Sequence, residues 1–488
     1  MKKLNRANSG TSSNLPIKVI QFGEGNFLRA FVEYAFQKLN QEIGFDAGIA
    51  VVQPISKGMV SVLNSQDGLY TLFTKGIKDG NEVEEKELIT NIVKGIDPYL
   101  SFDAYLKLAE EEKLEFIISN TTEAGIAFVE SDTIDMAPPS SFAAKLAVLL
   151  HHRFKHFNGA EDKALTIIPC ELINYNSDTL KQVVLDYIEL WNLSEEFKNW
   201  VTSACSFHNT LVDRIVPGYP RDQIEEYNKQ LDYEDNLIVS AETFFLWVIE
   251  GGEALKKKLP FDQTVLDVKI VSDMQPFRTR KVRILNGAHT SMVPFSILYG
   301  NQTVKESVDE SFTGPFIRSL VFDEIIPTLD MEKEELEAFA SAVFDRFRNP
   351  FVKHMLSSIA LNSISKFKVR VLPSLLEYIE RKNSLPLHLV YAFACLIRFY
   401  KGSFNGEDLP VNDDDVIVAN MKRIWELDAY DTVAEQVLQN EGYWGENLTQ
   451  VPRLQNAVAK ALEYIEEDGV QGGYIRFENE FKTTSYAN

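Results

Sequence analysis

The sequence lacks the features of a disulfide-stabilised or membrane-spanning protein. Its 488 residues include three cysteines, Cys170, Cys205 and Cys395, with no CxxC pair among them. This scarcity excludes a disulfide scaffold and a cysteine-based zinc site, and it fits a reducing cytoplasm. No apolar run reaches the roughly 18 residues that a membrane span requires, and the polar N-terminus lacks the apolar core of a secretory signal. We therefore expect a cytoplasmic protein that does not enter a membrane.

Positive charge is also scarce, because 49 Lys and Arg residues stand against 71 Asp and Glu residues, a formal net charge of −22. Such a balance disfavours nucleic acid and anionic membrane surfaces as partners. If the substrate is a small anion, its site must supply a local positive field. The histidine cluster His151, His152 and His156 has no nearby cysteine or convincing carboxylate to complete a metal set, so we expect no metal.

The first half of the chain alternates between strand and helix patterns. A helical pattern follows the first of the strand-like runs, from Asn26 to Leu39. This alternation predicts an α/β fold with a Rossmann-like, doubly wound parallel sheet, in which ligands bind at the carboxyl ends of the strands. The apolar runs that we interpret as buried strands are Ile17–Phe22, Ala47–Val52, Leu114–Ser119 and Ala164–Pro169.

After roughly residue 275 helical periodicity dominates, as in Glu334–Arg348, Leu387–Tyr400 and Val451–Glu467. A chain of this length is expected to form two domains. We predict a Rossmann-like dinucleotide-binding domain over residues 1–275 and a mostly helical substrate and catalytic domain over residues 276–488.

The segment GEGNFLRAF, Gly23 to Phe31, directly follows a predicted strand and opens a predicted helix. Gly23 would allow a tight turn, and Gly25 would let backbone N–H groups approach a pyrophosphate. Leu28 stands where the usual fingerprint has its third glycine, so a turn that merely needed glycine is the alternative. The residues that we expect to contact the cofactor are Gly23, Gly25, Asn26, Phe27, Arg29, Asn120 and Thr121.

The segment KVRILNGAH places Lys281, Asn286 and His289 on one broad face of a helix, at about 100° per residue. A dehydrogenase needs a group that moves the hydroxyl proton and donors that hold the developing alkoxide. A lysine can act as the base when burial lowers its pKa. From spacing alone, an ordinary amphipathic helix with a solvated polar face is the better explanation of these residues.

Three further segments carry candidate site residues. Asn174 and Asn176 follow a strand, where asparagines usually form turns. Asp213 either pairs with Arg214 or borders the site. In SKFKVRVLP, an extended backbone would place Lys366, Lys368 and Arg370 on one side. Such alternating cations are typical of a solvated edge strand, but they could also supply the field that an anionic substrate requires.

Together these motifs resemble the polyol-specific long-chain dehydrogenase/reductase family, also called the mannitol dehydrogenase family. The resemblance rests on G-E-G-N-F-L-R-A from Gly23, QDGLYT from Gln66, VDRI-P from Val212, and the K-x4-N-x2-H pattern that begins at Lys281. It spans residue 17 to beyond 370, and the joint order of the motifs is highly specific.

The resemblance implies that Lys281 is the general acid/base, that Asn286 and Asn176 form the oxyanion hole, and that His289 orients the substrate. Lys366 matches a family lysine near the substrate. The motifs look closest to the branch of the family that acts on uronates, which implies a sugar acid as substrate. On this basis we expect Lys368 and Arg370 to help hold its carboxylate and Asp213 to contact it.

The same resemblance favours NAD as cofactor without excluding NADP, because Gln53 stands where family members often have an acidic residue. Dehydrogenases for other uronates or for mannitol share the catalytic pattern and remain alternatives. A non-catalytic nucleotide-binding sensor is an alternative of a different class, although it would have no use for a proton-transfer lysine. The sequence leaves the oligomeric state open.

Overall fold

The structure is a computed structural model that describes residues 2–482 except 13, 123 and 352. The chain forms two compact units. The first consists of Met1–Gly76 and Glu82–Met274, and the second of Ile77–Asn81 and Gln275–Asn488. Ile77–Asn81 is the tip of the hairpin between β4 (Tyr70–Lys78) and β5 (Asn81–Ile89).

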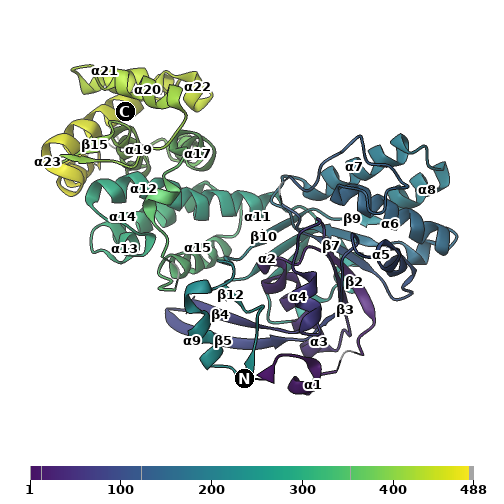
Figure 1. Cartoon of the computed structure of the whole chain (residues 1–488). Helices are drawn as coiled ribbons and strands as arrows, with labels where there is room; N and C mark the ends of the chain where they lie inside the picture. Colours follow the sequence, from purple (N-terminus) through teal and green to yellow (C-terminus); the bar gives the residue numbers. More distant parts are fainter. Residues whose placement is uncertain (1, 13, 123, 352, 483–488) are drawn as a thin grey trace. The chain divides into compact units, whose positions relative to one another are not determined.

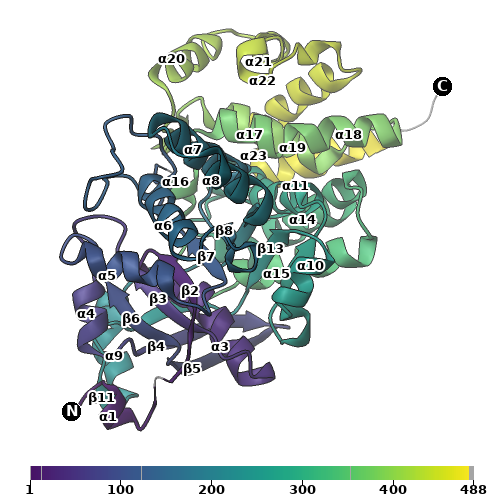
Figure 2. The same cartoon turned by 90° about the vertical axis from the view of Figure 1, so that its right-hand side faces the viewer.

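A six-stranded sheet lies at the centre of the first unit, in the order β6-β3-β2-β7-β8-β9 with every neighbouring pair parallel (Figures 1 and 2). The Rossmann-like α/β class predicted from the sequence is confirmed. The four predicted strands are present, whereas the two outer strands, β6 and β9, had no recognised pattern. The strands in chain order are β2 (Ile17–Phe22), β3 (Gly48–Val52), β6 (Ile92–Ile96), β7 (Phe116–Ser119), β8 (Thr166–Pro169) and β9 (Ser206–Phe207).

Both faces of this sheet are buried, which explains why its strands are continuous apolar runs. One face packs against α6 (Phe142–His156) and α7 (Asn176–Leu190). The other face packs against α3 (Val32–Ile43) and residues of two small sheets. These sheets are ordered β12-β4-β5 and β10-β13-β14. Their further strands are β10 (Thr210–Asp213), β12 (Val239–Glu242), β13 (Leu246–Glu250) and β14 (Val268–Val271).

The single helix predicted after the glycine turn is interrupted. It consists of α2 (Asn26–Ala30) and α3 (Val32–Ile43), because Phe31 between them has non-helical dihedral angles, φ −124° and ψ −74°. Phe31 stacks between Phe27, with ring centroids 4.9 Å apart, and Phe245 at 4.4 Å. The helix is thus interrupted at the residue whose ring takes part in this aromatic stacking.

The second unit is mostly helical. The three helical segments predicted there correspond to α15 (Lys333–Phe347), α19 (Leu387–Phe399) and α23 (Leu454–Lys482), the last broken at Gly469 with φ 71°. At its centre α12 (Gly287–Tyr299) and α19 pack against each other and are almost entirely buried. Among the described residues, no helix is long and apolar enough to span a bilayer.

Candidate functional site

The glycine turn lies at the carboxyl end of β2. Gly23 has φ +115°, and an added Cβ would lie 3.1 Å from the Asn120 carbonyl oxygen, so a side chain would be strained and crowded there. Gly25 is the N-cap residue that precedes α2, and an added Cβ would meet nothing within 4 Å. The backbone of the turn is therefore accessible at Gly25, as an approaching pyrophosphate requires.

A pocket of about 590 Å³ lies in the first unit beside this turn. It brings together the predicted residues Phe27 and Asn120. Thr122, in the same lining, has φ +89°, an unusual conformation for a β-branched residue that is typical of functional loops. The lining residues are Phe27, Asn120, Thr122, Ala124, Leu172 and Val212. Thr122, Ala124 and Leu172 were not among the residues that we expected to contact the cofactor.

Arg29 lies close to the turn but is an internal anchor. Its side chain is buried, and its guanidinium donates to the carbonyl oxygens of Glu24 and Leu237 and to Asn26 Oδ1, the last at 2.6 Å. Burial lowers the pKa of Arg29. The guanidinium therefore fixes the turn from within, and the side-chain amide oxygen of Asn26 is engaged in the same contact.

Thr121 is held by Glu171, a buried carboxylate that the sequence did not single out. The Thr121 backbone N–H and hydroxyl donate to Glu171 Oε1 at 2.9 and 3.0 Å, and the Ser119 hydroxyl donates to Oε2 at 3.0 Å. Burial raises the pKa of Glu171, although these hydrogen bonds oppose the shift. Glu171 thus links the carboxyl ends of β7 and β8, the same edge of the sheet at which the glycine turn follows β2.

Asn176 is fully buried at the start of α7. Its side-chain Nδ2 donates to the carbonyl oxygens of Pro169 at 3.1 Å and Glu171 at 3.0 Å, and its Oδ1 accepts from the Thr210 N–H at 3.0 Å. These bonds link β8, α7 and β10. The expected role of Asn176 in an oxyanion hole would require at least one of them to break.

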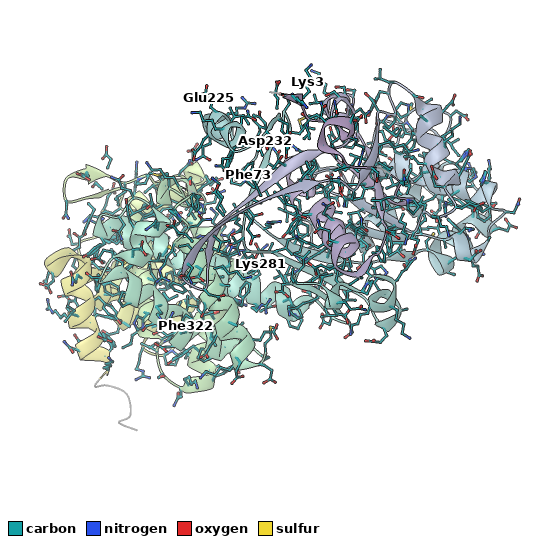
Figure 3. All side chains as sticks on the ribbon, turned by 90° about the horizontal axis from the view of Figure 1, so that it is seen from below. Lys3, Phe73, Glu225, Asp232, Lys281 and Phe322 are labelled. Carbon is teal, nitrogen blue, oxygen red and sulfur yellow. The ribbon has the colours of Figure 1, made fainter. Side chains whose placement is uncertain are left out.

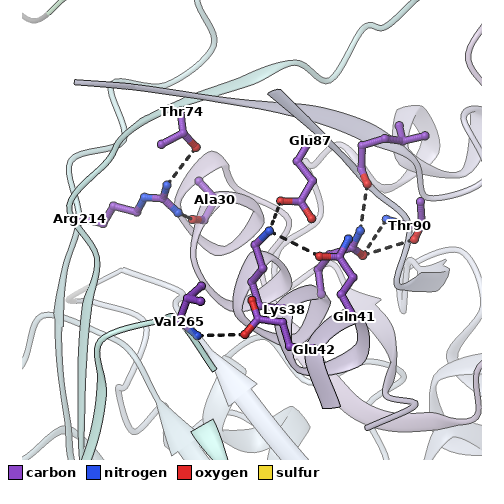
Figure 4. A network of polar contacts seen from close by, with 11 residues as sticks. Ala30, Lys38, Gln41, Glu42, Thr74, Glu87, Thr90, Arg214 and Val265 are labelled. Atoms are coloured by element: carbon purple, nitrogen blue, oxygen red, sulfur yellow. Dashed lines mark hydrogen bonds and ion pairs between the residues drawn. The ribbon is translucent and has the colours of Figure 1, made fainter. Parts of the chain in front are cut away.

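Arg214 does not depend on its neighbour Asp213 for partners. Its guanidinium donates to the carbonyl oxygens of Glu242 and Ala30 and to the Thr74 hydroxyl, as Figure 4 shows for the last two. Burial lowers its pKa to about 10. Asp213 is buried at the end of β10, next to Val212 of the pocket lining.

In the second unit, Lys281 and Asn286 bound a π-helical segment, Lys281–Asn286, that leads into α12 (Lys281 is labelled in Figure 3). The expected regular α-helix is therefore wrong in this segment. On an α-helix these residues would lie about 140° apart. The i→i+5 hydrogen bonding of a π-helix brings residues five apart close to one face, and such segments are frequent at functional sites. Both side chains are half-buried.

His289 follows in the first turn of α12 and lies among aromatic rings. Its ring centroid is 4.5 Å from that of Phe347 and 5.2 Å from that of His354. Burial lowers the pKa of His354, which favours its neutral form at pH 7. His354 lies 65 residues from His289 in the chain, and no motif in the sequence indicated it.

The cationic segment at 366–370 is a helix, α17 (Ser363–Arg370), and the extended conformation considered for it is wrong. Ile364 and Phe367 are buried while Val369 is 62% exposed, a helical pattern of burial. Phe367 stacks on Phe393 of α19, with ring centroids 4.6 Å apart. Alternation of charged and apolar residues therefore did not indicate a strand here.

The helix separates the three cations. Lys366 and Arg370, four residues apart, share a face, and burial together with the Arg370 charge lowers the pKa of Lys366. Arg370 Nη1 lies 3.5 Å from Thr290 Oγ1, and its carbonyl oxygen lies beside Gly287 of α12. Lys368 points elsewhere and lies against Gly445, where an added Cβ would be 3.3 Å from its amine.

The two units therefore hold different groups. The first contains the turn, the pocket and Asn176, and the second contains Lys281, Asn286, His289 and the Lys366–Arg370 pair. Within the described ranges there is no group of three or more His, Cys, Asp or Glu side chains that could hold a metal ion.

Comparison with known families gives two matches that together span most of the chain. Residues 17–263 match the mannitol dehydrogenase Rossmann domain, and residues 273–466 match the mannitol dehydrogenase C-terminal domain. The chain is 46% identical to an altronate oxidoreductase of Bacillus subtilis (strain 168), over 98% of this chain and 100% of the relative. It is 45% identical to an altronate oxidoreductase of Phocaeicola vulgatus, over 96% of this chain and 98% of the relative.

Two solved structures have a similar fold. A D-sorbitol dehydrogenase in substrate-free form gives a TM-score of 0.79 at 20% identity, covering 97% of this chain and 100% of its own. The Pseudomonas fluorescens mannitol 2-dehydrogenase, solved as a ternary complex with NAD and D-mannitol, gives a TM-score of 0.65 at 20% identity, covering 98% and 100%.

Proposed function

The chain belongs to the mannitol dehydrogenase family, and from this premise we propose that it catalyses the reversible, NADH-dependent reduction of D-tagaturonate to D-altronate. Altronate oxidoreductases at 44–46% identity over nearly the whole chain support this reaction. The structural observation that carries a sugar-acid substrate is the contact of α17 with α12. It puts Arg370 beside α12, which directly follows the Lys281–Asn286 segment. Lys366 lies one turn away on α17, where its amine donates to the Ile359 carbonyl oxygen at 2.9 Å and the Arg370 charge contributes to lowering its pKa.

Lys281 is the proton carrier in this proposal. In the reductive direction, NADH held by the first unit would supply the hydride that the keto carbon accepts. The Lys281 ammonium group gives a proton to the ketone oxygen as charge develops on it, which completes the hydroxyl group. Asn286, five residues on along the π-helical face, donates an amide hydrogen to the same oxygen and stabilises its charge. The amine of Lys281 then regains a proton from water.

His289 orients the substrate through its hydroxyl groups. Its packing against the Phe347 ring fixes the plane of the imidazole. Because the Asn176 amide is engaged in backbone contacts, we assign it the positioning of the β8–α7 connection and leave the oxyanion donation to Asn286. Asp213 remains a proposed substrate contact at the end of β10.

The substrate carboxylate is held by Lys366 and Arg370 in our proposal. Guanidinium groups bind carboxylates with two parallel hydrogen bonds, and a lysine four residues away on the same face adds a second positive charge. Lys368, which the sequence suggested as a third cation, faces Gly445 and is removed from this set. A chain of net charge −22 needs such a local field to attract an anion.

The residues of the first unit fit a dinucleotide. The positive φ of Gly23 forms the tight turn, the absence of a side chain at Gly25 exposes backbone N–H groups, and the pocket lined by Phe27 and Asn120 provides an apolar surface beside them. We propose NAD as the cofactor, with the turn holding its pyrophosphate.

A direct test follows the oxidation of NADH by the purified protein with D-tagaturonate, D-fructuronate, D-fructose and D-fructose 6-phosphate. We expect the highest kcat/KM with tagaturonate. A higher value with fructuronate or fructose would overturn the assigned substrate, and turnover of none of them, with NADH binding retained, would favour a nucleotide sensor. Arg370→Ala should raise KM for tagaturonate far more than KM for any neutral ketose that is turned over.

A further inference from the structure

The end of β3 has an amide where a dinucleotide-binding sheet usually has a carboxylate. Gln53 follows Val52 directly, and its side chain is buried. Its Nε2 donates to Asp97 Oδ2 at 3.3 Å and to the Ile55 carbonyl oxygen at 3.0 Å. A carboxylate therefore lies at this corner of the sheet after all, and it is contributed by the neighbouring strand.

The pairing of β3 with β6 explains how Asp97 reaches this corner. Val52 is in register with Ile96, and the Gln53 N–H donates to the Ile96 carbonyl oxygen at 3.0 Å. Gln53 and Asp97 are thus the first residues beyond the paired ends of two parallel strands, which lie side by side in Figure 2. Neighbouring strands are about 4.8 Å apart, so a carboxylate directly after β6 can replace one directly after β3.

Asp97 has a fixed orientation and uncompensated charge. Its Oδ1 accepts from the Tyr99 backbone N–H at 2.9 Å, and its Oδ2 accepts from Gln53. Both donors are neutral, and within the described chain no lysine or arginine forms an ion pair with Asp97. A carboxylate held by neutral donors keeps its acceptor capacity for hydroxyl groups and its repulsion for a phosphate.

Glu24, in the glycine turn, closes the other side of this corner. Its Oε1 accepts from the Met59 N–H at 3.1 Å. An added Cβ at Gly58 would lie 2.1 Å from this oxygen and 2.4 Å from Gln53 Oε1, so both side chains would have to move to admit it. Burial raises the pKa of Glu24, and the Asp97 charge adds to this shift. The loop after β3 is therefore tied to the turn, next to the Gln53–Asp97 pair.

We propose that Asp97, presented by Gln53, selects NADH over NADPH by accepting hydrogen bonds from the adenosine ribose and repelling a 2′-phosphate. This inference rests on the proposed dinucleotide site. It explains how the chain can prefer NADH although β3 is followed by a glutamine, Gln53. It also opposes Lys57, an exposed cation in the same loop whose charge alone would favour a 2′-phosphate.

The test is the dissociation constant of NADH and of NADPH, measured by quenching of tryptophan fluorescence, for the full chain and for Asp97→Asn. Gln53 can turn its amide to pair with the amide that this substitution introduces. We expect Asp97→Asn to improve NADPH binding at least about tenfold relative to NADH, the factor that about 1.4 kcal/mol of relieved repulsion gives. Asp103→Asn, an exposed carboxylate on the next helix, is the matched control and should leave the ratio unchanged.

The second part of the test restores a carboxylate at this corner of the sheet. Gln53→Asp in the Asp97→Asn background should return the preference for NADH, which a merely structural role of Asp97 would not explain. An unchanged NADH-to-NADPH ratio in Asp97→Asn, or an equal loss of both affinities, would overturn the proposal. If the unmodified protein bound neither nucleotide, the proposed function itself would fail, and the two failures are therefore distinguishable.

Discussion

Glu33 on α3 is fully buried behind the glycine turn, and its carboxyl group is expected to hold a proton near neutral pH. Its Oε1 accepts from Gln21 Nε2 at 2.7 Å, and its Oε2 lies 2.6 Å from the Tyr70 hydroxyl. That hydroxyl also lies 2.6 Å from the Arg29 carbonyl oxygen. One hydroxyl hydrogen cannot serve both acceptors well, so a proton on Glu33 completes the network.

The pKa of Glu33 determines how much this residue changes the free energy of unfolding with pH. Burial raises the pKa of Glu33 from 4.5 to about 7. The folded state thus binds one more proton than the unfolded state between these values, and the stability that Glu33 contributes is complete below about pH 4.5. It falls as the pH rises toward 7 and is constant above that. The loss amounts to roughly 3 kcal/mol, since each pKa unit corresponds to about 1.4 kcal/mol.

Glu33→Gln should remove this dependence, because a glutamine can accept from Gln21 and donate to Tyr70 without a charge. Urea unfolding of both proteins between pH 5 and pH 8 measures it. We expect the variant to gain about 2 to 3 kcal/mol relative to the unmodified protein across that range. Glu82→Gln, an exposed carboxylate on β5, should give no such trend. A stability difference between Glu33→Gln and the unmodified protein that stays constant with pH would contradict a raised pKa of Glu33.

Three further outcomes are expected. Gly23→Ala should weaken NADH binding and lower the melting temperature, since an L side chain at φ +115° costs about 1–3 kcal/mol; unchanged NADH affinity would contradict this. Asn176→Asp should destabilise the protein by about 3 kcal/mol or more, because a buried carboxylate would face two carbonyl oxygens; a normal melting temperature with reduced kcat would indicate an oxyanion role instead. Lys368→Ala should leave kcat/KM for tagaturonate within about twofold of the unmodified value. Arg370→Ala should lower it at least about tenfold, because charge-assisted hydrogen bonds contribute about 1.5–3 kcal/mol. Equal effects of the two substitutions would argue against the separation of the two side chains by α17.

Local patterns predicted much of the fold and of the turn. Four buried strands, Gly23 and Gly25 were identified because apolar runs and glycines act within a few residues. The helical second half followed from its periodicity. The two outer strands of the main sheet were missed because they are partly exposed and so lack a continuous apolar run, and because β9 has only two residues.

Features that depend on tertiary packing could not be predicted from local sequence patterns. The alternating cations of α17 favoured a strand, but burial of Phe367 against Phe393 fixes a helix. The π-helical turn that draws Lys281 and Asn286 onto one face has no recognised sequence signal. Glu171 and His354 reach their partners across many intervening residues, so no local motif could indicate them.

The substitution Lys281→Ala shows whether Lys281 carries the proton to a uronate ketone. Turnover of NADH with tagaturonate and the dissociation constant of NADH are measured on the same preparation. We expect a loss of at least about 100-fold in kcat, with NADH affinity close to that of the unmodified protein. A variant that retains most of its turnover of tagaturonate would contradict it.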